Sequence, residues 1–413
     1  MTEWKVTEIG VIPNEWEVKL VEELVNDGIL AKPMDGNHGN IHPKGNDFTE
    51  AGIPFIMATD VNNGHIDLLN CKFIKKEQAD SLQKGFSVKG DVLLTHKASL
   101  GRTAIVKDNK YPYIMLTPQV TYYRVLNKDK LNNKYLKYYF DSPIFQGVLY
   151  NHGSSGSTRA YVGITAQREL PILLPPIDVQ LVLSETLSSL DDKIDLLHHH
   201  NKTLEQMAET LFRQWFVFNA SEKWESRPLS SIATFLNGLA CQKYPPEKES
   251  EKLPVLKIKE LRNGISKDCD YCTSNVKAEY IIENGDVIFS WSASLMVKIW
   301  NGERCVLNQH LFKVTSDEFP KWYYYLWCKH HLNEFINISA SHATTMGHIK
   351  RRDLDDAMVL VPKADEIKYY SEIITPLIDK IIFNNKQITK LTMLRDTLLP
   401  KLMSGEAKVE ING

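Results

Sequence analysis

The chain has 413 residues, with 49 Lys and Arg against 51 Asp and Glu and a formal net charge of −2. This length is sufficient for more than one domain, and the charge by itself does not indicate nucleic-acid binding. No run of 18 apolar residues occurs, and Met1-Thr2-Glu3-Trp4 does not begin a signal peptide, so we expect a soluble, cytoplasmic protein.

The first part of the chain predicts buried strands that end in polar turns or loops. Pro54–Gly64 is typical of a strand that runs into an Asn-Gly turn. Gly90–Leu100 places a Gly-Asp turn before a second strand, which opens into a polar loop. Thr117-Pro-Gln119 precedes a β-rich stretch at Val120–Val125. The Gly-rich run 36–45 is expected to be a mobile surface loop.

Helical patterns follow these strands. We expect an amphipathic helix over Asn133–Phe140, then a polar loop over residues 153–159. From Ile177 to Phe216 the chain lacks Pro and Gly for about forty residues, which predicts a helix of roughly 60 Å. Its apolar residues recur at alternating steps of four and three, the spacing of a coiled-coil seam. The seam positions are Leu183, Leu187, Leu190, Ile194, Leu197, Asn201, Leu204, Ala208, Leu211 and Trp215.

The rest of the chain repeats this order. Pro254–Gly264 aligns with Pro54–Gly64, and Gly285–Leu295 aligns with Gly90–Leu100. Further along, the repeat includes Leu307-Asn-Gln309 for Thr117-Pro-Gln119, a helix over Lys321–Phe335, and a polar loop over 337–345.

A second seam follows the first at a constant offset along the chain. The tripeptide Asp192-Lys193-Ile194 returns as Asp379-Lys380-Ile381, and these two tripeptides define the offset. The positions of the second seam are Ile374, Leu377, Ile381, Asn384, Ile388, Leu391, Arg395, Leu398 and Leu402.

The repeated polar loops contain the candidate ligand-binding residues. Short hydroxyl, amide and Arg or Lys side chains on loops suit the binding of phosphates and base edges. Such loops are also ordinary connectors, and their recurrence at matching places leaves a connector role and a ligand-binding role both open. The candidates are Lys97, Ser99, Arg102, Gln119, Ser155, Ser157, Thr158, Arg159, Trp291, Ser292, Ser294, Lys298, Gln309, Ser341, His342, Thr344 and Thr345.

Several motifs of enzymes and metal sites are absent or incomplete. No GxxxxGK[ST] phosphate loop and no GxGxxG motif occurs, so nucleotide hydrolysis and dinucleotide binding are not indicated. Cys269 and Cys272 form a CxxC motif without a second Cys/His pair at zinc-finger spacing, which favours reduced structural thiols. His198-His199-His200 lies in a predicted helix, where consecutive side chains do not share a face, so we expect no metal there.

Two globular segments alternating with two similar long helices resemble the specificity subunit of type I restriction–modification systems. The marks are the Gly-Asp-Val-Leu/Ile strand with Ala-Ser-Leu (Gly90–Leu100 and Gly285–Leu295) and the Leu-Pro-Pro-Ile-Asp-Val-Gln motif at residues 174–180. One departure is that the second long helix begins after Leu360-Val-Pro-Lys-Ala-Asp-Glu366, without the second Pro or the Gln.

The resemblance implies an α+β fold with two target-recognition domains, residues 1–175 and 218–362, and two long helices, residues 176–217 and 363–413, that form an antiparallel coiled coil. It implies a non-catalytic subunit that reads a split, asymmetric site in double-stranded DNA. Two methyltransferase subunits would dock on the helices, and restriction subunits would join the full complex. AdoMet, ATP and Mg would then be bound by partner subunits, with no cofactor, metal or membrane bound by this chain.

Two other functions are alternatives to a DNA-reading subunit. A stand-alone enzyme would need convergent His, Glu or Asp side chains, whereas the repeated loops are rich in hydroxyls and poor in acids. A scaffold that binds only proteins, without reading bases, would have the same helices but would show no sequence-dependent binding to DNA.

The two seams also predict a helix register. In an antiparallel pair, the residue numbers of facing layers have a constant sum. Asn201 and Asn384 are the amide residues of the two seams, and a buried amide requires a partner. Pairing them sets the sum at 585 and places Leu197 on Ile388 and Leu187 on Leu398.

Overall fold

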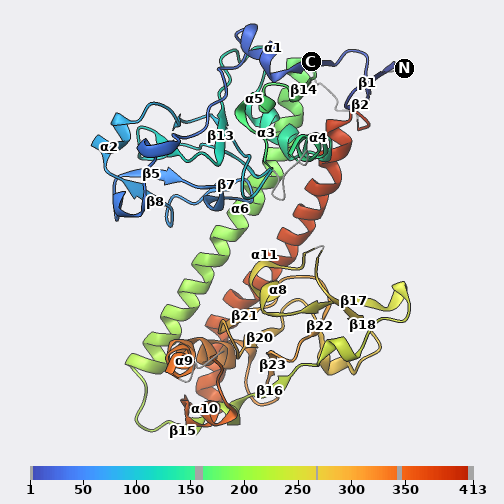
Figure 1. Ribbon diagram of the computed structural model, residues 1–413. Helices are drawn as coiled ribbons and strands as arrows, with labels where there is room; N and C mark the ends of the chain where they lie inside the picture. The colour runs from blue at the N-terminus through green and yellow to red at the C-terminus, as the bar shows by residue number, and fades with distance from the viewer. Residues whose placement is uncertain (1–2, 154–160, 267, 342–346, 408–413) are drawn as a thin grey trace. The chain divides into compact units, whose positions relative to one another are not determined.

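The computed structural model describes residues 3–153, 161–266, 268–341 and 347–407. The chain divides into two compact units, residues 1–192 with 393–413 and residues 193–392 (Figure 1). Each unit combines strands and helices, which confirms the predicted α+β class.

The first unit contains a five-stranded sheet of order β4-β8-β5-β12-β9, in which β5 and β12 run parallel, and a three-stranded sheet of order β11-β10-β13. Its strands are β1 (Trp4–Thr7), β2 (Gly10–Pro13), β3 (Glu17–Leu20), β4 (Phe48–Thr49), β5 (Ile53–Ile56), β6 (Val61–Asn62), β7 (His65–Ile66), β8 (Lys72–Ile74), β9 (Phe86–Ser87), β10 (Val92–Thr95), β11 (Thr103–Ile105), β12 (Ile114–Leu116), β13 (Val120–Tyr123) and β14 (Pro171–Leu174). Its shorter α-helices are α1 (Val21–Asn26), α2 (Lys76–Ser81), α3 (Asn133–Asp141), α4 (Pro143–Gly153) and α5 (Ile164–Gln167).

The second unit contains two four-stranded sheets, of orders β18-β17-β22-β19 and β16-β23-β20-β21, and again one pair, β17 and β22, is parallel. Its strands are β15 (Glu225–Pro228), β16 (Thr234–Asn237), β17 (Lys252–Leu256), β18 (Tyr271–Thr273), β19 (Ile281–Ile282), β20 (Val287–Ser290), β21 (Met296–Ile299), β22 (Cys305–Leu307), β23 (Leu311–Thr315) and β24 (Met358–Val361). Its shorter α-helices are α7 (Leu229–Ile232), α8 (Ile258–Asn263), α9 (Lys321–Ser341) and α10 (Arg351–Asp356).

The parallel strand pairs of the two units have the same backbone geometry. The N–H of Thr117 donates to the carbonyl of Ile56 at 3.0 Å, and the N–H of Asn308 donates to the carbonyl of Leu256 at 3.1 Å. Thr117 therefore corresponds to Asn308, and Gln119 corresponds to His310. The predicted alignment of Gln119 with Gln309 is wrong by one residue.

A two-stranded sheet closes each globular part. β3 pairs with β14, and β15 pairs with β24, both antiparallel. The repeated Trp-Glu at Trp16 and Trp224 stands at the start of β3 and β15. These pairs bring the beginning of each globular part next to the strand that precedes its long helix.

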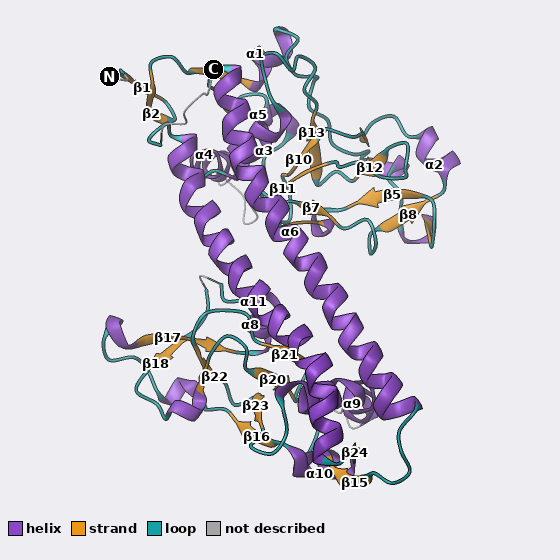
Figure 2. Cartoon of the chain, turned by 180° about the vertical axis from the view of Figure 1, so that it is seen from behind, coloured by secondary structure: helices purple, strands orange, loops and turns teal. Residues whose placement is uncertain are grey.

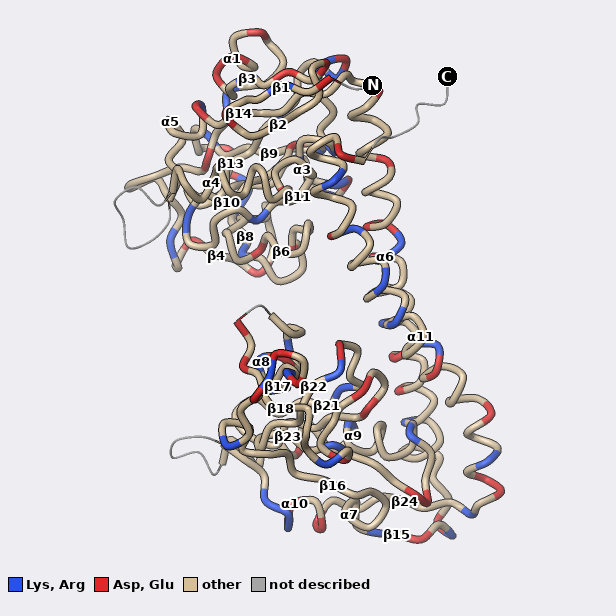
Figure 3. The backbone as a smooth tube through the Cα atoms, turned by 90° about the vertical axis from the view of Figure 1, so that its right-hand side faces the viewer, with Lys and Arg blue, Asp and Glu red and all other residues tan. Residues whose placement is uncertain are grey.

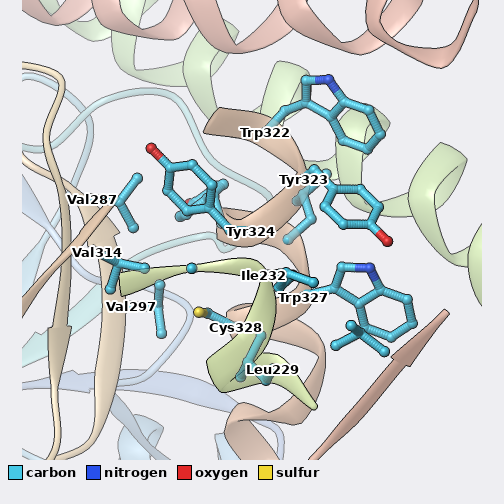
Figure 4. Close-up of a cluster of buried hydrophobic side chains, with 14 of the residues drawn as sticks. Leu229, Ile232, Val287, Val297, Val314, Trp322, Tyr323, Tyr324, Trp327 and Cys328 are labelled. Carbon is cyan, nitrogen blue, oxygen red and sulfur yellow. The ribbon is translucent and has the colours of Figure 1, made fainter. Parts of the chain in front are cut away.

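Helix α9 differs from the amphipathic helix that its sequence predicts. All residues from Trp322 to Cys328 are buried, because strands cover one side of α9 and the long helices cover the other. Figure 4 shows α9 side chains beside Val287 and Val314 of the sheet. On the opposite side the ring of Trp327 lies 5.0 Å from that of Phe212.

The long helices are α6 (Ile177–Arg213), which continues into a π-helical turn over Gln214–Phe218, and α11 (Ala364–Met403) (Figure 2). They form the predicted antiparallel coiled coil. In the first unit, the core includes the seam residues Leu183, Leu187, Leu398 and Leu402. In the second unit, Ile194, Leu197, Ile388 and Leu391 form one cluster.

The predicted polar layer is present in the second unit. Asn384 Nδ2 donates to Asn201 Oδ1 at 2.9 Å, and Asn201 Nδ2 donates to Asn385 Oδ1 at 2.7 Å. At the end of α6, by contrast, Phe212 rather than the seam residue Leu211 belongs to the core, since α9 widens the buried face there.

A partly buried ion-pair cluster attaches the strands and helices of the first unit to its long helices. Asp191 of α6 accepts hydrogen bonds from Tyr138 Oη at 2.7 Å and Arg395 Nη1 at 2.9 Å, and Lys137 lies 3.4 Å away. Burial alone would raise the pKa of Asp191, but Lys137 and Arg395 outweigh it and the pKa is lowered. The Arg395 guanidinium therefore binds carboxylates of α6 and of its neighbour Asp396, rather than extending into water.

The second unit contains a similar cluster. Tyr325 follows Tyr138 at the offset of the two seams, and it donates to Glu205 of α6 at 2.6 Å. Lys329 donates to the same oxygen at 2.7 Å and also pairs with Glu209. Burial would raise the pKa of Glu205, but Lys329 lowers it. In both units a tyrosine and a cation thus hold a carboxylate of α6.

One local prediction is wrong and another holds only in part. Asn263-Gly264 ends helix α8, with Gly264 at φ 84° as its C-terminal cap, whereas Asn63-Gly64 forms the expected turn between β6 and β7. The run 36–45 is not simply a surface loop. Asp35 and Asn37 are buried, and a Cβ on Gly36 would lie 1.9 Å from the Leu116 carbonyl oxygen.

Candidate nucleic-acid interface

The loops after β10 and β20 have the same strained conformation. Ala98 has φ 68°, and Ala293, its counterpart in the aligned Ala-Ser-Leu motif, has φ 56°. This left-handed region costs a residue with a Cβ about 1–2 kcal/mol. In each loop the hydroxyl of the last strand residue donates to a carbonyl four residues on, Thr95 to Ser99 and Ser290 to Ser294. The backbone shape of this loop is therefore common to the two repeats, whereas the side chains on it differ.

Lys97 is an exposed cation of the first loop. Its ammonium lies 5.6 Å from the ring centroid of Tyr161, and the backbones of the two residues form a β-bridge. The ring and the bridge orient a charge that faces solvent, an arrangement that suits a phosphate contact. The next predicted residues, Ser155, Ser157, Thr158 and Arg159, lie outside the described residues.

Arg102 and Lys298 each contact backbone carbonyl oxygens within their own unit. Arg102 Nη1 lies 3.4 Å from the carbonyl oxygen of Val61, and Lys298 Nζ donates to the carbonyls of Leu261 and Arg262 at 3.1 and 3.2 Å. Burial, together with the charge of Arg262, lowers the pKa of Lys298. Each cation holds the segment that follows the first parallel strand of its unit, and their contacts with DNA remain predictions.

Trp291 organises the equivalent loop of the second unit. Its ring stacks on Phe312 with centroids 5.7 Å apart, and its Nε1 donates to Asn237 Oδ1 at 3.2 Å. The backbone of Ser292 forms a bridge with His348, and Ser292 Oγ lies 3.4 Å from His310 Nδ1. The loop is thus joined to two histidines that are not among the predicted residues, although His310 directly follows Gln309 of an aligned motif.

The remaining candidates are distributed around these loops. Gln119 Oε1 accepts the N–H of Ala58 at 3.3 Å, and Gln309 Nε2 lies 3.4 Å from His310 Nε2. Ser341 is exposed at the end of α9 and donates to the carbonyl of Ile338. The last predicted residues, His342, Thr344 and Thr345, lie outside the described residues.

Metal ligands and membrane segments were also sought among the described residues. They contain no group of three or more His, Cys, Asp or Glu side chains arranged to hold a metal ion. All six cysteines are buried and unpaired by disulfides. None of the described helices is long and apolar enough to cross a membrane.

Charged residues do not gather into a single basic face along the long helices. Figure 3 shows acidic and basic residues interspersed on α6 and α11. Electrostatic attraction to DNA would therefore come from the loops of the globular parts rather than from the helices.

Comparison with known proteins places this geometry in a family. The family described as "Type I restriction modification DNA specificity domain" matches residues 13–206 and 221–393. The type I restriction enzyme MjaIX specificity subunit of Methanocaldococcus jannaschii is 26% identical over 438 residues, covering 99% of this chain and 97% of that protein. The HindI specificity subunit of Haemophilus influenzae is 18% identical, covering 86% of this chain and 94% of that protein.

The fold has a solved counterpart. The crystal structure of the type I restriction–modification S subunit from M. genitalium aligns with a TM-score of 0.56 at 14% identity, covering 97% of this chain and 98% of that one. The duplicated frame and the family match, which recurs once in each half, agree. The chain therefore belongs to the type I restriction–modification DNA specificity family and carries the specificity domain twice.

Proposed function

We propose that this chain is the non-catalytic subunit that reads a split DNA site for a type I restriction–modification complex. The two recognition domains, residues 1–175 and 218–362, would each contact one half of the site. The observation that carries this proposal is the repeated loop with Ala98 and Ala293, which has one backbone shape and two sets of side chains. Because the side chains differ, the two half-sites would be unlike, and the site would not be a palindrome.

The long helices would hold the domains apart and bind the methyltransferase subunits. On α6, Leu196 (45% exposed) and Met207 (48%) are exposed apolar side chains. Their counterparts on α11, at the offset of the two seams, are Phe383 (52%) and Leu394 (47%). Exposed apolar side chains at repeat-related positions suit two copies of one protein partner.

AdoMet, ATP and Mg would be bound by partner subunits. The function of this chain would then be to position those subunits on DNA. A restriction subunit would join through the methyltransferases. The alternative, a protein-only scaffold, is favoured by no feature of the polar loops.

Domain exchange tests the proposal. Residues 1–175 would be replaced by the first domain of a relative, and methylated adenines would be mapped in a host that supplies the methyltransferase. We expect one half-site to change and the other to stay. A complex that binds all sequences equally would support the scaffold instead, and turnover by the isolated chain with AdoMet and DNA would identify it as an enzyme.

A further inference from the structure

A recess lies beside the Trp291 loop in the second unit. It has a volume of about 310 Å³, and its lining includes Lys257, Lys259, Gln309 and His310. The recess forms where the segment after β17 meets the residues between β22 and β23. Both segments belong to the strand arrangement that the two units share.

The equivalent positions of the first unit follow from the strand registers. Leu256 pairs with Leu307 as Ile56 pairs with Leu116, so Lys259 corresponds to Thr59 and His310 corresponds to Gln119. The registers across β23 and β13 agree, since Leu311 faces Ser290 as Val120 faces Thr95. Equivalent backbone positions thus carry Gln119 and Thr59 in the first unit and His310 and Lys259 in the second.

His310 is exposed, and its ring lies next to the side chains of Ser292 and Trp291. Its Nδ1 lies 3.4 Å from Ser292 Oγ, and its ring centroid lies 6.0 Å from that of Trp291. Lys257 is paired with Asp270, whereas Lys259 is exposed and makes no ion pair among the described residues. The recess therefore presents the Lys259 ammonium, which carries three donors, beside His310, whose Nε2 accepts from Gln309 Nε2.

We infer that this structurally equivalent position reads a base in both domains, with Gln119 in the first and His310 in the second. The inference rests on the proposed function and names residues within it. A glutamine amide carries one donor and one acceptor in the arrangement that matches the N6 and N7 edge of adenine. The ammonium donors of Lys259, beside His310, match an edge with two acceptors, the O6 and N7 of guanine.

The test is a reciprocal exchange in the full complex with methyltransferase, His310→Gln with Lys259→Thr in one chain and Gln119→His with Thr59→Lys in another. Binding would be measured on a library in which each base of both half-sites is varied. The first variant should change the preferred base at one position of one half-site, guanine giving way to adenine, by roughly tenfold to a hundredfold. The second should make the opposite change in the other half-site. The unmodified half-site reports in each case that the chain is folded.

Unchanged base preferences in both variants would overturn this inference and leave the proposed function intact. A switched base preference in both half-sites from one variant would overturn it as well, because the position would then act on the whole chain. If the histidine variant lost recognition of both half-sites, Lys259→Thr alone would decide, since Lys259 is exposed and its replacement spares the Trp291 loop. An unmodified complex without sequence preference would refute the proposed function itself.

Discussion

Asn384 on α11 donates a hydrogen bond to Asn201 on α6, and Asn384 is fully buried. The interaction fixes which layers of the two helices face one another, because slipping by one layer would leave buried amides against apolar side chains. Asn385, also buried, accepts from Asn201 and extends the polar layer.

Replacing one member of this pair should destabilise the chain. We expect Asn384→Leu to cost about 1–3 kcal/mol, because Asn201 loses a donor in a buried layer. The double variant Asn201→Leu with Asn384→Leu should recover part of this loss while specifying the register less strongly. Thermal unfolding of the single and double variants measures the effect. A single variant as stable as the parent would show that the layer is hydrated rather than buried.

The Asp191 cluster predicts a dependence of stability on pH. The lowered pKa of Asp191 means that its contribution is present above the unfolded value of about 4 and is lost as pH falls through the folded pKa. Asp191→Asn should therefore lower stability by about 1–3 kcal/mol at pH 7. The difference from the parent should shrink in acid below pH of about 4.

Asp396→Asn is the matched control for that measurement. Asp396 binds the same guanidinium of Arg395, but its side chain is 59% exposed. We expect this substitution to change stability by less than about 1 kcal/mol at pH 7. Equal effects of the two substitutions would mean that burial gives Asp191 no special role.

The strained alanines predict separate control of the two half-sites. A β-branched residue is strongly disfavoured at positive φ, so Ala98→Val should distort only the first loop and Ala293→Val only the second. Each variant should weaken reading of one half-site in the binding assay. Ala98→Gly and Ala293→Gly, which relieve the strain, should retain reading of both. Loss of both half-sites from one valine variant would argue against independent loops.

Salt dependence separates phosphate contacts from bracing contacts. Lys97→Met should lower the slope of log affinity against log salt by about one, since one phosphate contact is lost. Lys298→Met should mainly lower the unfolding temperature, because it removes two hydrogen bonds to the end of α8. If its salt slope also fell by about one, Lys298 would reach a phosphate as its sequence context predicts.

The repeat-related apolar residues predict a docking defect. Phe383→Ser and Leu196→Ser should each weaken binding of one methyltransferase copy, because each removes an exposed apolar contact while sparing the buried seam. Analytical ultracentrifugation with purified methyltransferase would detect a shift from two bound copies toward one. Leu69→Ser is the control, since Leu69 is also exposed but lies between β7 and β8, and it should leave the stoichiometry unchanged.

The helices and their register could be predicted from the sequence, whereas parts of the recognition loops could not. Burial imposes a 3.5-residue period on the seam, and the buried amides Asn201 and Asn384 then select one register. The loops lack any such period. The matching residue types align Gln119 with Gln309, yet the strand registers place His310 there.

The two Asn-Gly dipeptides show a second limit of structure prediction from the sequence. Asn-Gly favours positive φ, and this geometry serves both a hairpin turn at Asn63-Gly64 and a helix end at Asn263-Gly264. Similarly, the glycine at residue 36 is needed because a carbonyl of β12 lies against it, a tertiary contact that loop composition does not record.

The antiparallel seam has a consequence for how relatives of this chain can change length. Adding one helical turn to α6 near Lys202 would move every later layer out of phase with α11, and Asn201 would remain opposite Asn384 while Leu204 no longer met Ile381. A compensating turn at the matching place in α11 would restore the pairing. Lengthening of the rod is therefore a paired event, in which α6 and α11 each gain a turn.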